Sequence, residues 1–139
     1  MHTLNRGKLF AAVWSGDSAM ITEQITKILV RTISYYDYRE DFYHAFLAGI
    51  FTGAGYRVES NKEHGEGKSD IVVKDTRNFR IAVFEIKYAD KKAELGKCCD
   101  IALAQIVNRQ YTVEYIEDYD EILCYGVSFC KKRCLVKKA

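Results

Sequence analysis

The chain has 139 residues, of which 48% are hydrophobic and 29% charged, and its formal net charge is +2. This length and composition indicate one globular domain over residues 1–139, and they exclude a second half with its own ATPase or cofactor-binding site within these residues. Because 13% of the residues are aromatic and the sequence has no low-complexity run, a disordered protein is excluded as well.

The chain contains five cysteines, an odd number without CxxC spacing. This usage indicates reduced thiols and a cytoplasmic protein, and the sequence shows no signal peptide or apolar run of membrane length. We therefore expect no membrane partner. A zinc site built from Cys130, Cys134 and either Cys98 or Cys99 stays open as an alternative, although zinc ligands usually come in closer pairs.

The first part of the chain is predicted to be mostly helical. Residues 1–16 have no firm period, and we expect an irregular segment that docks on the core. Apolar residues at helical spacing predict two helices, over residues 18–33 and 38–51. Asp37 is suited to cap the second helix, and Glu40 lies three residues later, where a capping-box partner would be.

The hydrophobic period then changes to two residues, which predicts β-strands. We expect strands over residues 56–59, 70–74 and 80–88, with a polar loop over residues 61–69. The third strand, RIAVFEIKY, is apolar on both faces in its first half. A strand of this kind is buried on both sides, so helices are expected to cover both faces of the sheet.

The last part of the chain predicts one helix and two strands. A long helix is expected over residues 94–116, followed by strands over residues 121–130 and 134–138. The last strand is rich in lysine, which suits the edge of a sheet. The elements of the chain thus follow in the order α-α-β-β-β-α-β-β, with a core over about residues 33–138. The expected fold class is α/β, a mixed sheet flanked by helices.

Three charged residues occur where a buried sheet is predicted. Glu85 and Lys87 are two residues apart in one strand and share a face, and a hairpin brings Asp70 alongside them. A buried carboxylate is costly unless it is paired, protonated or bound to a cation. The set is therefore either a salt bridge at a strand end or an oxygen-rich site that suits Mg²⁺, with a lysine that can act on a bound water.

Five segments of the sequence form an ordered series: ISYYDYREDFYHAFL, SNKEHGEGKSDIVV, FEIKY, ALAQIVNRQY and YGVSF. The series resembles the PD-(D/E)XK nuclease superfamily, in particular the nuclease-like domain at the C-terminus of many bacterial and archaeal AAA-ATPase-like proteins. Ser69 stands where the PD motif has proline, a position that varies in the superfamily. The resemblance spans residues 33–129 and implies a restriction-endonuclease-like fold.

The resemblance also implies roles for the residues of the second and third motifs. Asp70 and Glu85 would be direct ligands of Mg²⁺ or Mn²⁺, and the backbone carbonyl of Ile86 would add a third oxygen. Lys87 would serve the attacking water.

Two further residues receive roles from the resemblance, each with an alternative. Glu40 would approach the metal through a water, or would only cap its helix. Gln105 would support the substrate or the lysine, or would only hydrogen-bond the sheet edge. Tyr43 and His44 follow Glu40 by one turn and could reach a phosphate, whereas a buried, hydrogen-bonded histidine is the simpler interpretation of His44.

These features together predict a metal-dependent nuclease that hydrolyses phosphodiester bonds, with DNA as its substrate and an AAA-type ATPase as a candidate second partner. The alternative is a catalytically silent module that retains the nuclease fold and binds nucleic acid or an ATPase. Lys91, Lys92 and Lys97, with the basic C-terminal residues 131–138, could form a rim for a phosphate backbone or could serve solubility.

Overall fold

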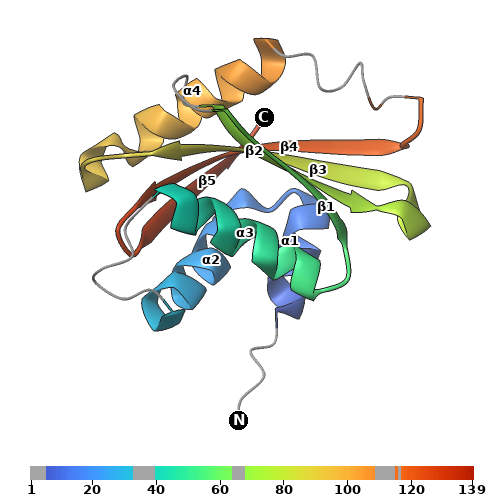
Figure 1. Cartoon of the computed structure of the whole chain (residues 1–139), viewed down its shortest axis with the longest axis horizontal. Helices are drawn as coiled ribbons and strands as arrows, with labels where there is room; N and C mark the ends of the chain where they lie inside the picture. Colours follow the sequence, from blue (N-terminus) through green and yellow to red (C-terminus); the bar gives the residue numbers. More distant parts are fainter. Residues whose placement is uncertain (1–5, 33–39, 64–67, 109–114, 116) are drawn as a thin grey trace.

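Figure 1 shows the computed structural model of the protein, which describes residues 6–32, 40–63, 68–108, 115 and 117–139. The helices are α1 (Gly7–Ser15), α2 (Ser18–Thr32), α3 (Glu40–Gly53) and α4 (Leu95–Asn108), and the strands are β1 (Arg57–Glu63), β2 (Lys68–Asp75), β3 (Arg80–Tyr88), β4 (Glu121–Cys130) and β5 (Arg133–Lys138). α4 covers one face of the sheet, and α1, α2 and α3 cover the other (Figure 1).

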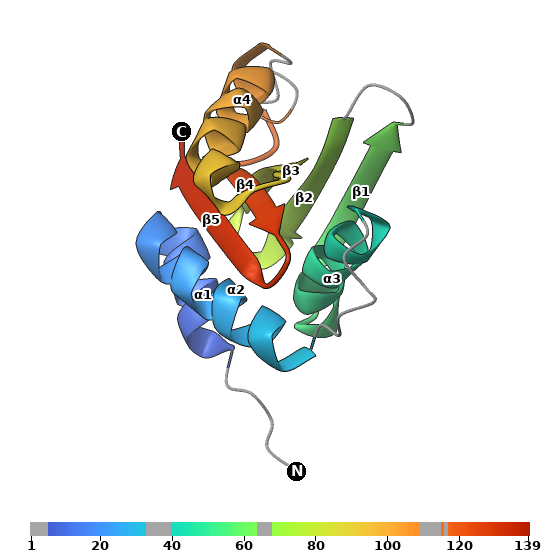
Figure 2. The same cartoon turned by 90° about the vertical axis from the view of Figure 1, so that its left-hand side faces the viewer.

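The sheet has five strands in the order β1-β2-β3-β4-β5. β3 and β4 are parallel, and the other neighbouring strands are antiparallel. Parallel neighbours need a crossover connection, and α4 lies in the connection between β3 and β4. In the view of Figure 2, α1 and α2 lie beside β5, and α3 lies beside β1. The expected mixed α/β sheet flanked by helices is therefore confirmed.

The strands with apolar sequences follow the prediction closely. The strands expected over residues 80–88, 121–130 and 134–138 are confirmed as β3, β4 and β5, with β5 beginning one residue earlier. The helix expected over residues 18–33 is confirmed as α2 as far as its last residue, Thr32. Strong periodicity in the sequence explains this agreement, because each of these elements buries a continuous apolar face.

Two parts of the prediction lie outside the described residues. The expected helix cap at Asp37 falls within residues 33–39, and much of the second half of the helix expected over residues 94–116 falls within residues 109–114. Within the helix expected over residues 94–116, the structure describes α4, which ends at Asn108.

The irregular segment expected for residues 1–16 is a wrong prediction, since Gly7–Ser15 form helix α1. Leu9, Ala12 and Val13 lie on one helical face and are buried in the core. The period is hard to detect in the sequence because apolar residues also occupy the neighbouring positions of this short helix. The expectation that the segment docks is confirmed, since the hydroxyl of Tyr125 donates a hydrogen bond of 2.5 Å to the Val13 carbonyl oxygen.

The hairpin of β1 and β2 is longer than predicted. β1 covers Arg57–Glu63 rather than residues 56–59, and the two strands leave much less of residues 61–69 for the expected loop. β1 is an edge strand, and most of its described side chains are exposed or half-buried. Its backbone can pair with β2 without an apolar residue at every second position. The alternation of apolar residues that predicts a strand is therefore weak in the sequence of β1.

The two faces of β3 pack against different helices. Phe84 lies against Phe51 of α3 and Tyr125 of β4, with ring centroids 5.3 and 5.1 Å apart. Successive side chains of a strand point to opposite faces. Glu85, the next residue, therefore faces the side of the sheet that α4 covers.

α4 approaches β4 very closely at Gly126. A Cβ atom placed on Gly126 would lie 2.6 Å from the Cys99 carbonyl oxygen and within 3.2 Å of two side chains of α4. Two residues later, the Ser128 hydroxyl donates a hydrogen bond of 2.8 Å to the Leu95 carbonyl oxygen. These contacts fix the position of α4 over the face of the sheet that carries Glu85.

We expect the variant Gly126→Ala to lower the free energy of unfolding by about 1–3 kcal/mol, because the added methyl overpacks a tight interface. Gly49→Ala is the matched control, since a Cβ atom there would meet nothing within 4 Å. Alanine is favoured over glycine inside a helix by about 1 kcal/mol, so this variant should be neutral or more stable. Urea unfolding followed by circular dichroism measures both, and equal stability of the two variants would contradict the close approach.

Candidate active site

Two buried carboxylates lie side by side at the centre of the sheet. Asp70 of β2 is the register partner of Glu85 of β3, and their exposed fractions are 5% and 0%. Antiparallel partners point to the same face, with Cβ atoms about 4.5–5.5 Å apart. The prediction that the hairpin brings Asp70 alongside Glu85 is therefore confirmed. We call Asp70 and Glu85 the acid pair.

β2 and β3 separate at the acid pair. Their pairing ends at Asp70 and Glu85, although β2 stays paired with β1 as far as Lys68 and β3 stays paired with β4 as far as Tyr88. Ile86 is the first residue of β3 beyond this fork, with β4 but not β2 as a partner strand. At this fork, the backbone of β3 beyond Glu85 has no hydrogen-bonded partner strand on the β2 side among the residues that the structure describes.

Lys87 lies on the same face of β3 as Glu85, because the two residues are two apart. Its register partner is Ser128, which contacts the first turn of α4. Burial raises the pKa of the Cys98 thiol of α4, and the positive charge of Lys87 partly offsets this rise. Lys87 is half-buried. Its ammonium group is close enough to influence Cys98 in the first half of α4, and it lies on the same face of the sheet as the acid pair.

Gln105 lies on α4, two helical turns after Cys98 and thus on the same helix face. Its Oε1 atom is buried and accepts no hydrogen bond from the residues that the structure describes. The alternative in which this oxygen accepts a hydrogen bond from the sheet edge is therefore not observed. A buried polar atom in this state is costly, and such atoms occur where a ligand completes the bonding.

Glu40 is the first residue of α3, which packs on the face of the sheet opposite to α4. Its side chain is exposed, and its carbonyl oxygen accepts a hydrogen bond of 3.0 Å from the Tyr88 hydroxyl. Within the described parts of the chain, no group of three or more His, Cys, Asp or Glu side chains is positioned to hold a metal ion. Glu40 therefore does not form such a cluster with the acid pair, and its contact through water stays a prediction.

Asn61 is a site residue that the sequence analysis missed. It is the register partner of Asp70 on β1, and its Nδ2 atom donates a hydrogen bond of 2.9 Å to Asp70 Oδ1. The neutral amide orients the carboxyl group of Asp70. Asn61 was assigned to the expected loop, and the signal that could have found it is the continuation of the β1–β2 pairing toward the turn.

His44 and Tyr43 have structural roles in α3. His44 is 7% exposed and contacts the Ser60 hydroxyl through Nε2. Burial lowers the pKa of His44, and the negative charge of Asp70 opposes this shift. The simpler interpretation of a buried, hydrogen-bonded histidine is confirmed. The Tyr43 hydroxyl donates a hydrogen bond of 2.7 Å to the Lys131 carbonyl oxygen.

The zinc alternative gains no support from the cysteines. Within the residues that the structure describes, these cysteines do not form a group of three or more ligands that could hold a metal ion. Burial raises the pKa of the Cys99 and Cys134 thiols. Cys99 contacts the Ser128 hydroxyl at 3.2 Å and the Leu135 carbonyl oxygen at 3.1 Å. These contacts are those of packed core residues.

The sequence was also compared with known proteins. The family model of the PD-(D/E)XK nuclease superfamily matches residues 38–139. The chain belongs to this superfamily. The match covers the whole of the sheet, α3 and α4, and it leaves α1 and α2 outside.

PD-(D/E)XK nucleases generally use divalent metals, which agrees with the oxygen-rich chemistry of the acid pair. No curated protein matches the chain. The closer relation to domains of AAA-ATPase-like proteins stays a prediction. In the described part of the chain, no helix is long and apolar enough to cross a membrane.

We expect the stability of the protein to fall as the pH drops below the ordinary His44 pKa of 6.5. The folded-state pKa is lower than that of the unfolded chain, so between the two values the unfolded chain binds the proton more readily. The variant His44→Gln should flatten this dependence. Urea unfolding of both proteins between about pH 7.5 and pH 5.5 measures the difference.

The carboxyls of Glu59 and Asp75, whose pKa values are lowered from 4.5 and 3.8, titrate below that pH range and do not interfere. Parallel stability curves for the wild type and His44→Gln would show that burial does not shift the His44 pKa.

Proposed function

We propose that the protein is a metal-dependent nuclease that hydrolyses the phosphodiester bonds of DNA. The observation that supports this most strongly is the acid pair, Asp70 opposite Glu85 in the sheet register. Lys87 follows on the same face, so the three side chains of the D…ExK motif share one surface of a sheet that belongs to a nuclease superfamily.

The residues of this site fit a hard divalent cation. Mg²⁺ is usually bound through one or two carboxylates, with water and substrate phosphates as the other ligands. Asp70 and Glu85 supply two carboxylates, and the backbone carbonyl of Ile86 at the fork is our candidate for a third protein oxygen. Like charges directly opposite each other in a sheet are destabilising, and a bound cation would offset that repulsion.

The protein side chains would divide the work of hydrolysis among them. A bound divalent cation would lower the pKa of a water and offset charge on the phosphoryl oxygen. Asn61 holds the Asp70 carboxylate in place through its hydrogen bond. Lys87 would orient the attacking water and stabilise negative charge that develops on the phosphate. Gln105 would bring its buried amide oxygen to the substrate or to the Lys87 ammonium.

DNA as the substrate and an AAA-type ATPase as a second partner are proposed on the resemblance to domains of AAA-ATPase-like proteins. The silent alternative, a module that binds nucleic acid or an ATPase without cleavage, uses the same fold. Metal binding and cleavage are therefore tested separately.

Mg²⁺ or Mn²⁺ should stabilise the wild type, because a ligand that binds only the folded state adds about 2.7 kcal/mol at a hundred times its dissociation constant. The double variant Asp70→Asn/Glu85→Gln should lose this effect. Asp118→Asn/Glu121→Gln removes two exposed carboxylates and should keep it. Thermal unfolding with and without the ions measures the shift. A wild type that shows no shift, even with a DNA duplex present, would contradict the metal site.

The variant Lys87→Ala should reduce cleavage of DNA by about 10²-fold or more, because loss of one group that stabilises developing charge costs a factor of about 10²–10³ in rate. Its metal-induced stabilisation should persist. Lys27→Ala is the matched control, since Lys27 is exposed on α2 and pairs with Glu23 at 3.2 Å. Loss of a fluorescent substrate over time measures the rate. If Lys87→Ala cuts as fast as the wild type, the proposed role is wrong, and a wild type that binds metal and DNA without cutting is the silent module.

A further inference from the structure

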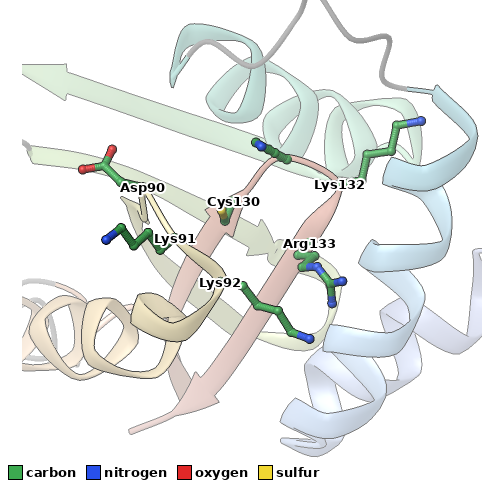
Figure 3. A pocket seen from close by; sticks show the side chains of 7 residues that line it. Asp90, Lys91, Lys92, Cys130, Lys132 and Arg133 are labelled. Atoms are coloured by element: carbon green, nitrogen blue, oxygen red, sulfur yellow. The ribbon is translucent and has the colours of Figure 1, made fainter.

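A basic pocket lies at the end of the sheet where β3 and β4 finish (Figure 3). It has a volume of about 530 Å³. Its lining includes Asp90, Lys91, Lys92, Lys131, Lys132 and Arg133. Five of these side chains are cationic and one is a carboxylate, so the pocket is strongly positive. We call it the basic pocket.

The basic pocket joins two segments that are far apart in the sequence. One segment follows β3 and the other forms the turn between β4 and β5 (Figure 3). The Ala89 backbone N–H donates a hydrogen bond of 2.8 Å to the Phe129 carbonyl oxygen, which ties the segments together. The structure thus brings Lys91 and Lys92 together with the basic residues 131–133, which are part of the phosphate rim that the sequence suggested. Lys97, Lys137 and Lys138 do not line the pocket.

Contacts with Tyr43 of α3 fix the turn between β4 and β5, which carries Lys131 and Lys132. Lys131 adopts a left-handed backbone conformation with φ 54°, which is unusual for a lysine. Its carbonyl oxygen accepts the hydrogen bond from the Tyr43 hydroxyl, and the Tyr43 ring stacks on Phe129 with centroids 4.8 Å apart. These contacts therefore fix the backbone of this turn.

The basic pocket is also close to the acid pair along β3. Lys91 comes four positions after Lys87 in the chain. A chain spans at most about 3.6 Å per residue, so the Cα atoms of these two lysines are at most about 14 Å apart. Each strand of duplex DNA carries one phosphate per about 3.4 Å of the helix axis. A phosphate in the pocket would therefore lie within about four nucleotides of a phosphate at Lys87.

We propose that the basic pocket binds a backbone phosphate of the nucleic-acid strand that the acid pair cleaves. This inference rests on the proposed nuclease function and assigns the substrate path on one side of the scissile bond. Lysine and arginine side chains bind phosphate oxygens without reading bases. The pocket thus positions the strand and contributes equally to the affinity for all sequences.

The test compares the double variant Lys92→Gln/Arg133→Gln with the control Lys8→Gln/Arg77→Gln, which removes the same charge from exposed positions of α1 and of the loop between β2 and β3. The probes are a short fluorescent DNA duplex and its single strand, and anisotropy gives the affinity. Measurements use EDTA, and Mg²⁺ in the Lys87→Ala background, so that cleavage does not interfere.

The pocket variant should bind at least about tenfold more weakly at moderate salt. Its slope of log K against log salt should be shallower by about one, since each lost phosphate contact removes about 0.9. The control should match the wild type. The charge-preserving variant Lys92→Arg/Arg133→Lys should retain the salt slope, which separates loss of charge from a change in folding, and thermal unfolding checks that each variant is folded.

The outcomes separate this inference from the proposed function. Suppose that the wild type cleaves DNA and the pocket variant cleaves it with an unchanged KM and salt slope. The inference that the basic pocket binds a substrate phosphate is then wrong, and the nuclease function stands. If the pocket variant loses affinity as expected but the wild type never cleaves, the pocket stands and the nuclease function is wrong. A wild type that binds neither probe overturns the pocket.

Discussion

The site depends on the burial of β3 on both of its faces. Phe84 and Ile86 face the core that α3 closes, and Val83 packs in a second apolar cluster on the opposite face. Glu85 lies in this strand with no exposed surface. An ionised carboxylate cannot remain there at low cost unless a positive charge or several hydrogen-bond donors surround it. The other buried residues of β3 are all apolar, which makes Glu85 chemically distinctive.

The parallel pairing of β3 and β4 explains how this position is covered. α4 lies in the crossover connection, and the absence of a side chain at Gly126 lets it approach the sheet directly beside Glu85. On the other side of β3, the pairing with β2 stops at Asp70. One side of the acid pair is thus closed by a tightly packed helix, and the other lies at a fork between strands.

Much of this arrangement could be predicted from sequence, and the exceptions share a physical cause. The run of apolar residues within 80–88 predicts a buried strand, and the spacing of two residues predicts the common face of Glu85 and Lys87. Asn61 was missed because an edge strand is stabilised by backbone hydrogen bonds that leave little trace in its side chains. The face on which Glu40 lies could not be predicted either, because it depends on how α3 packs across the sheet and not on spacing along the chain.

The acid pair and the basic pocket carry opposite charges and lie one after the other toward the same end of the sheet. The acid pair suits a cation, Lys87 follows it in the strand, and the cations of the basic pocket lie a few residues further on. A single cation-binding site has no need of the second, positive site, and a general phosphate-binding surface has no need of buried acids. A polyanionic strand with a metal ion at one of its phosphates meets both requirements, since neighbouring phosphates then fall on positive charge. The arrangement of charges therefore favours a polymer over a small phosphorylated molecule as the substrate.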